Sequence, residues 1–132
     1  MYTPGMIIKI GTESEKLGVV LESSGTMVKY LGLTSDMDNN KSNTALYPLT
    51  RDVFEMSSDN KPDVIYAHLD VICIAEGEFK ICGRINSNQT FVELMSYLNG
   101  YKNYSKMIKE RFDVDATKIE IVEPSISLRK TV

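Results

Sequence analysis

The sequence has no tryptophan, a single histidine and only two cysteines, and this scarcity excludes several kinds of site. His68, Cys73 and Cys82 show no CxxC or HxxxH spacing, so a zinc or other metal centre is not expected. The two cysteines lie on strands expected to be neighbours, which would permit a cross-strand disulfide, but buried free thiols are favoured for a cytosolic chain. The glycines form no GxxxxGK or GxGxxG loop, and no cofactor is expected.

Long apolar runs are also missing. No stretch approaches the roughly 18 apolar residues that a membrane-spanning helix needs, and residues 1–13 lack the basic leader and apolar segment of a secretory signal. The sequence therefore predicts a cytoplasmic protein without a membrane partner. A formal net charge of −3 argues against coating nucleic acid by bulk charge, but it leaves room for a local basic groove.

What is present is the composition of an ordinary soluble domain. The chain has 132 residues, of which 42% are hydrophobic and 25% are charged. A chain of this length buries roughly two-thirds of the surface that it exposes when unfolded. We therefore expect a single domain over residues 1–132, with a barrel core at residues 4–100 and a C-terminal extension at residues 101–132.

Residues 17–36, LGVVLESSGTMVKYLGLTSD, predict a β-hairpin. Val19, Val20 and Leu21 form one apolar run, and the second arm carries apolar residues on both faces. Between the arms, residues 23–26 include a glycine that can adopt positive φ, as a hairpin turn requires. An isolated hairpin is only marginally stable in water, so further strands must cover this one.

Four other stretches predict strands. Residues 5–11 are a short apolar run between glycines, and residues 44–50 contain Pro48, which removes a ladder hydrogen bond and places this strand at an edge or a bulge. Residues 64–75, VIYAHLDVICIA, predict one long central strand. Residues 79–85 predict a half-exposed strand that pairs back on it.

One helix is predicted at about residues 88–99, ended by Asn99 and Gly100. Asn86, Ser87 and Asn88 are its candidate N-caps. Its apolar residues recur at i, i+3, i+4 and i+7, which places on one helical face Phe91, Leu94, Met95 and Leu98.

The remaining sequence gives weaker signals. Residues 104–112 are more basic and at best weakly amphipathic as a helix. Residues 118–128, KIEIVEPSISL, look extended, and Pro124 excludes them from a central strand.

In this order the predicted elements resemble the compact barrel of the PemK/MazF-like growth-inhibiting toxins. PGMIIKI resembles the family's opening strand, LGVVLES its second, YLGLTSD its third, DVIYAHLDVICI its long strand, and GRINSNQTFVELMSYL its last strand and helix, over about residues 4–100. The resemblance implies a mainly β (α+β) fold, a small SH3-like barrel of antiparallel strands closed by a C-terminal helix. It also implies a toxin-like endoribonuclease that cleaves single-stranded RNA without metal, a homodimer, and an antitoxin protein or RNA as partner.

The family's cleavage residues match this chain in part. The family has an arginine at the start of its second strand, where this chain has Leu17 and Gly18, and a Thr or Ser at the end of its third strand, where Thr34 and Ser35 match. On the long strand, His68 stands near the family's acidic position and Val71 near its second arginine.

Cleavage through the RNA's own 2′-hydroxyl needs a base, an acid, and donors or cations for the charged phosphorane. His68 is the candidate base or acid because its ordinary pKa is near neutral. Asp70, two residues along the expected strand, is the candidate that orients it. Thr34 and Ser35 are candidate catalytic donors to phosphate. The candidate RNA-binding cations are Arg51, Arg84 and Lys29.

Each of these assignments has an alternative. His68 and Asp70 can be a half-exposed strand pair without a catalytic role, and Thr34 and Ser35 can satisfy the backbone groups of a turn. The tyrosines and lysines that follow the helix can be packing and solvated residues rather than a base-stacking edge. The whole chain can be a non-catalytic barrel that binds a protein or a nucleic acid, because fold alone does not fix function.

Overall fold

The structure is a computed structural model that describes residues 2–10, 16–35, 45–57, 61–101, 106–112 and 117–122, the last two ranges and Tyr101 by their backbone only. These residues form ten strands, one 3-10 helix and one α-helix: β1 (Met6–Lys9), β2 (Leu17–Ser24), β3 (Met27–Thr34), β4 (Leu46–Thr50), η1 (Arg51–Val53), β5 (Phe54–Met56), β6 (Val64–His68), β7 (Val71–Glu76), β8 (Lys80–Ile85), α1 (Asn88–Tyr101), β9 (Lys106–Phe112) and β10 (Thr117–Val122). The expected mainly β class with a C-terminal helix is confirmed.

The predicted hairpin is formed by β2 and β3. Ser24 pairs with Met27, and Gly25 between them has a φ of +61°, a conformation that glycine adopts without a steric penalty. Leu21 is an extra residue in β2, because Val20 pairs with Tyr30 while Glu22 already pairs with Lys29. This bulge explains the imperfect alternation of the hairpin sequence.

Both faces of the hairpin are buried. Val19, Leu21 and Leu31 belong to a core on the side of α1, together with Leu94 and Leu98, which we call the helix-side core. The opposite face packs into a second core, the distal core, made of Ile8, Ile10, Val20, Val28, Tyr30, Cys73, Ala75 and Phe79. A third cluster, the groove core, is made of Ile7, Leu49, Phe54 and Ile65.

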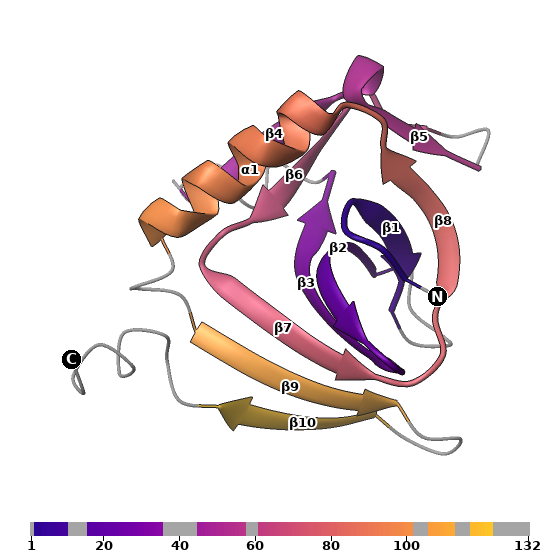
Figure 1. Cartoon of the computed structure of the whole chain (residues 1–132), viewed down its shortest axis with the longest axis vertical. Coiled ribbons are helices and arrows are strands. Elements are labelled where there is room, and N and C mark those ends of the chain that lie inside the picture. Colours follow the sequence, from indigo (N-terminus) through magenta and orange to yellow (C-terminus); the bar gives the residue numbers. More distant parts are fainter. Residues whose placement is uncertain are drawn as a thin grey trace.

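The strands form one curved, half-barrel sheet in the order β10-β9-β7-β3-β2-β1-β8-β5, from which β6 and β4 branch beside β3 (Figure 1). β4 pairs only with β6 among the described strands, which confirms the edge position predicted from Pro48. The predicted pairing of residues 79–85 with the preceding strand is wrong, because β8 pairs with β1 and β5 instead. The two cysteines therefore lie on strands that are not neighbours, and both thiols are free.

Residues 64–75 form two strands rather than the single long strand predicted. β6 pairs with the end of β3 and with β4, whereas β7 pairs with the first half of β3. Between them the backbone N–H of Leu69 donates to the carbonyl of Ala45 at 2.8 Å. The change of partner bends the chain at Leu69 and Asp70, and the strand-like composition of residues 64–75 does not show where such a bend falls.

The C-terminal part extends the same sheet. β9 replaces the weak amphipathic segment predicted at residues 104–112, and it pairs in parallel with β7, which corrects the expectation of an all-antiparallel sheet. β10 pairs with β9 and lies at the end of the sheet order, as expected for an extended segment outside the centre. Pro124 and the loop region at residues 37–43 lie outside the described residues.

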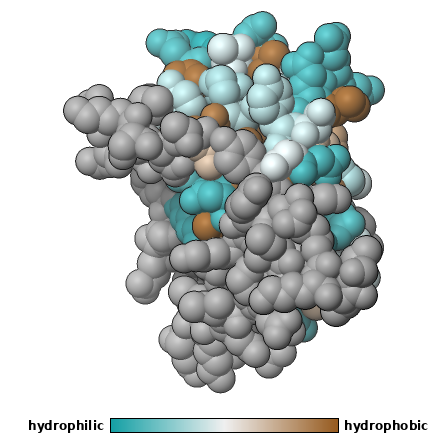
Figure 2. All heavy atoms as spheres, turned by 90° about the vertical axis from the view of Figure 1, so that its left-hand side faces the viewer, coloured by the Kyte–Doolittle hydropathy of each residue, from teal (hydrophilic) through white to brown (hydrophobic). Residues whose placement is uncertain are grey.

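The helix begins as predicted and ends slightly later, at Tyr101. The hydroxyl of Ser87 accepts a hydrogen bond from the N–H of Thr90 at 3.2 Å, which identifies the N-cap. Leu94 and Leu98 are buried, and on the outer side seen in Figure 2 the coloured residues are mostly hydrophilic, with apolar residues in separate spots. No helix in the described part of the chain combines the length and the apolar character needed to cross a membrane.

The closest packing in the hairpin involves Gly18, which tests the fold directly. Gly18 pairs with Gly32, and a Cβ at Gly18 would collide with the ring of Tyr30, whereas a Cβ at Gly32 would meet only the His68 ring at 3.8 Å. We expect Gly18→Ala to lower the free energy of unfolding by about 1–3 kcal/mol in urea titrations. The matched Gly32→Ala should change it by less than about 1 kcal/mol. Equal effects of the two substitutions would contradict this packing.

The contact between β4 and α1 predicts a dependence on alkaline pH. The Tyr47 hydroxyl donates to Glu93 Oε2 at 3.3 Å, and burial, followed by the Glu93 charge, raises the pKa of Tyr47. Because the folded pKa lies above the ordinary value of about 10, the stability that this group adds is present below pH about 10 and is lost as the pH rises through the folded pKa. The free energies of unfolding of wild type and Tyr47→Phe should therefore converge as the pH rises above about 10. In a Glu93→Gln background the difference between the two should depend less on pH.

Candidate functional site

A groove opens at one end of the sheet, over the groove core. It has a volume of about 660 Å³, within the range of small-molecule and nucleotide sites. Its apolar lining residues are Leu17, Leu33, Met56, Pro62 and Ile65. Its polar lining residues are Lys9, Thr34, Ser35, Ser57, Lys80 and Cys82.

Strand register builds one wall of the groove. Leu33 pairs with Leu17, Leu17 pairs with Lys9, and Lys9 pairs with Lys80. Residues directly opposite each other in antiparallel strands project to the same face with their Cβ atoms about 5 Å apart. These four side chains therefore form a row across β3, β2, β1 and β8, apolar at one end and cationic at the other.

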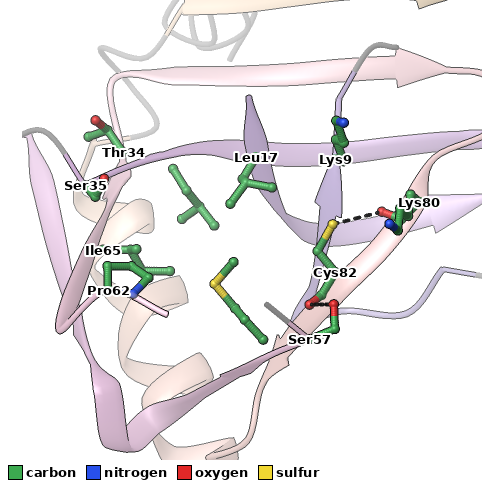
Figure 3. A pocket seen from close by; sticks show the side chains of 11 residues that line it. Lys9, Leu17, Thr34, Ser35, Ser57, Pro62, Ile65, Lys80 and Cys82 are labelled. Carbon is green, nitrogen blue, oxygen red and sulfur yellow. Dashed lines mark hydrogen bonds between the residues drawn. The ribbon is translucent and has the colours of Figure 1, made fainter. Parts of the chain in front are cut away.

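Hydroxyl groups lie across the groove from the two lysines. Figure 3 shows Thr34 and Ser35 on one side together with Ile65 and Pro62, and Lys9, Lys80, Cys82 and Ser57 on the other. Thr34 ends β3, where it pairs with Tyr66 of β6, so the sheet fixes its position. The groove is thus lined by lysines on one side of its apolar residues and by Thr34 and Ser35 on the other.

The Cys82 side of the groove depends on a second bulge. Ile7 pairs with Gly83 while Ile8 pairs with Ile81, which leaves Cys82 as the extra residue of β8. The backbone N–H and the hydroxyl of Ser57 both donate to the Cys82 carbonyl, at 2.8 and 3.2 Å. Bulges redirect side chains, and here the bulge lies in the part of β8 that lines the groove.

The three cations predicted to bind RNA do not line this groove. Arg51 pairs with Asp63 at 3.3 Å, Arg84 with Glu55 at 3.2 Å, and Lys29 with Glu22 at 2.8 Å. These pairs involve exposed carboxylates and contribute little to stability. They do provide each predicted cation with a nearby counter-charge.

By contrast, neither Lys9 nor Lys80 has a carboxylate within ion-pair distance among the residues that the structure describes. Lys80 is exposed and Lys9 is half-buried. Sequence reasoning missed both lysines, since neither lies in a motif. The signal that could have found them is the register of β1 against β2 and β8, which a sequence without its strand partners does not reveal.

His68 and Asp70 lie outside the groove. His68 ends β6 and Asp70 lies in the bend that follows, with His68 Nδ1 3.9 Å from Asp70 Oδ1. Ile65, which lines the groove, and Ala67 are buried on one face of β6, whereas His68 belongs to the other face and lies over Gly32. The structure therefore brings the predicted catalytic residues together as two separate pairs.

Two further expectations concern other parts of the chain. The predicted base-stacking edge depends on the side chains of Tyr101, Lys102, Tyr104, Lys106 and Lys109, which lie outside those that the structure describes, although Tyr97 is described and is exposed. Within residues 2–10, 16–35, 45–57 and 61–100, no three His, Cys, Asp or Glu side chains come close enough to hold a metal ion.

Comparisons with protein families, with curated proteins and with solved structures found no match to this chain.

The groove predicts a difference in reactivity between the two thiols. Cys82 lines the groove, whereas Cys73 is only 6% exposed in the distal core. A bulky water-soluble thiol reagent should modify Cys82 of the native protein at least about tenfold faster than Cys73, which needs local opening of the structure. Cys82→Ser should abolish the fast phase and Cys73→Ser should preserve it. Two equally slow thiols would show that the groove is closed to solutes.

Proposed function

We propose that this chain binds single-stranded RNA in the groove between β1, β8 and the end of β3. The observation that carries the proposal is that Leu17, Thr34 and Ser35 line one groove. These residues come from different strands, and they occupy the positions at which the resemblance to PemK/MazF-like toxins puts RNA-cleavage chemistry. A single RNA site requires these positions to lie close together in space, as they do in the groove.

The chemistry of the groove suits a nucleotide chain. Lys9 and Lys80 supply positive charge on a protein whose formal net charge is −3, so anion binding depends on this local field rather than on bulk charge. Leu17 and Leu33, at the apolar end of the row, offer a surface to the face of a base or a ribose. Thr34 and Ser35 have hydroxyls that can donate to phosphate or interact with a ribose 2′-hydroxyl.

The size of the groove favours an unpaired strand. A volume of about 660 Å³ is enough for a nucleotide whose base has left its stack, whereas a base inside a duplex must first be unpaired to enter it. Sequence-specific recognition of RNA generally uses such splayed nucleotides, whose base faces and edges are both accessible.

Cleavage of the bound RNA is a second candidate function, that of a toxin-like endoribonuclease. Lys9 is the cross-strand partner of Leu17, so an ammonium group stands one strand away from the position at which the resemblance expects an arginine. A cation and two hydroxyls can stabilise a charged phosphorane after attack by the 2′-hydroxyl, whose proton passes to water while the Lys9 ammonium protonates the 5′-oxygen that leaves. In this arrangement His68 takes no part, because it does not line the groove.

The first test is binding of fluorescent, mixed-sequence RNA oligonucleotides at low salt, in single-stranded and duplex forms. We expect single-stranded RNA to bind more tightly and to protect Cys82 from the thiol reagent. Thr34→Val combined with Ser35→Ala should weaken binding by about fivefold or more, because each lost hydrogen bond contributes roughly 0.5–1.5 kcal/mol.

Thr26→Val is the matched control for this variant. Thr26 is exposed just before β3, at the other end of the strand from Thr34, so its substitution should leave the affinity unchanged. No binding of any RNA by folded wild-type protein, or binding that leaves Cys82 fully reactive, would contradict the proposal.

The same samples, incubated without added metal and separated on a denaturing gel, test the second candidate. Specific cuts that disappear in the Thr34→Val/Ser35→Ala variant and persist in His68→Ala would support cleavage in the groove. Intact RNA in complexes that protect Cys82 would leave binding as the function.

A further inference from the structure

We infer that Lys9 and Lys80 together form a subsite for one phosphodiester group of the bound RNA. This inference rests on the proposed function and adds the position and the chemistry of a single phosphate. The two lysines are Cα partners in β1 and β8, and both line the groove.

Placing two lysines opposite each other opposes sheet pairing. Like charges in directly opposed positions of an antiparallel pair are destabilising, since their side chains leave the sheet side by side. An anion between the two ammonium groups converts this repulsion into two attractions. A phosphate oxygen pair is suited to the position because ammonium groups form strong, charge-assisted hydrogen bonds to it.

Two charged pairs of the sheet join opposite charges. Glu22 lies directly opposite Lys29, and Glu55 lies directly opposite Arg84, so each of these cations has its counter-charge within the sheet. Lys9 opposite Lys80 and Lys118 opposite Arg111 are instead like-charged pairs, and of these two pairs it is Lys9 and Lys80 that line the groove. Local violations of this kind are expected at functional sites.

The row of side chains also gives the bound strand a direction. From Lys80 and Lys9 the row continues through Leu17 to Leu33, next to which Thr34 begins the hydroxyl side of the groove. Three strand spacings separate the two ends, about 14 Å. The phosphate subsite and the hydroxyls therefore contact different parts of the RNA, with the apolar residues between them facing a nucleoside.

The salt dependence of binding tests this inference. For single-stranded nucleic acid, each neutralised phosphate contributes about −0.7 to the slope of log affinity against log salt. We expect Lys9→Gln, Lys80→Gln and the double variant to make the slope less negative by about the same amount, roughly 0.7, because all three disable one shared subsite. Affinity at low salt should fall about tenfold or more.

Lys29→Gln and Arg84→Gln are the matched controls. Both substitutions remove a cation that already has a carboxylate partner outside the groove, so the slope should stay at the wild-type value. Unchanged slopes in the Lys9 and Lys80 variants, with wild-type RNA binding intact, would overturn the subsite while leaving the proposed function in place. A change of salt slope in the double variant that equals the sum of the two single changes would also overturn the subsite, because it indicates two separate phosphate contacts.

Inorganic phosphate separates this inference from the proposed function. At equal ionic strength, replacing chloride by phosphate should raise the melting temperature of wild-type protein and of Lys29→Gln, but not of the Lys9→Gln/Lys80→Gln variant. This shift in a protein that binds no RNA would support an anion subsite and contradict RNA binding. No shift together with no change of the RNA salt slope would overturn the subsite.

Discussion

The β2–β3 hairpin is buried on both faces, and the rest of the structure depends on this constraint. Alternate side chains of a strand point to opposite faces, so Val19 and Leu31 need one apolar cover and Val20 and Tyr30 need another. The helix contributes Leu94 and Leu98 to the first cover, and the chain around β6 and β7 contributes Ala67, Leu69 and Ile72. Flanking strands and Phe79 supply the second, and for this reason the sheet must curve around the hairpin.

The groove is a consequence of the same curvature. At the open end of the β2–β3 hairpin, where β1 ends and β8 begins, the third and smallest cluster, the groove core, lies under the groove. Residues on the same strand face as a buried residue then lie at the edge of the groove core. Lys9, for example, lies on the same face of β1 as the buried Ile7, two residues earlier. The position of the charged groups is therefore set by strand pairing and not by a loop. Such groups are held with the precision of the sheet.

The parts of the fold that sequence predicted correctly are those with local signals. The hairpin has a glycine turn between apolar arms, and the helix has an N-cap followed by a regular apolar face. The partners of β8 and the division between β6 and β7 were predicted incorrectly, because both depend on contacts between distant residues. Periodicity within a strand does not specify which strand lies beside it.

The candidate site shows the same division. Thr34 and Ser35 could be identified because they end a recognisable strand, and the structure places both in the groove. His68 was plausible for its chemistry, but the structure places it outside the groove, near Gly32. Lys9 and Lys80 become candidates only because they lie opposite each other. That position depends on the pairing of two strands that are far apart in the sequence.

The parallel pairing of β7 with β9 has a consequence for how the chain is made. Val71 finds its partner Lys106 only after β8 and the whole of α1 have been synthesised, so β7 has an open edge in the nascent chain. Contacts of such long sequence separation form slowly, and an unpaired strand edge is a template for association with other chains. Emergence of β9 from the ribosome is therefore the step that ends the exposure of this edge.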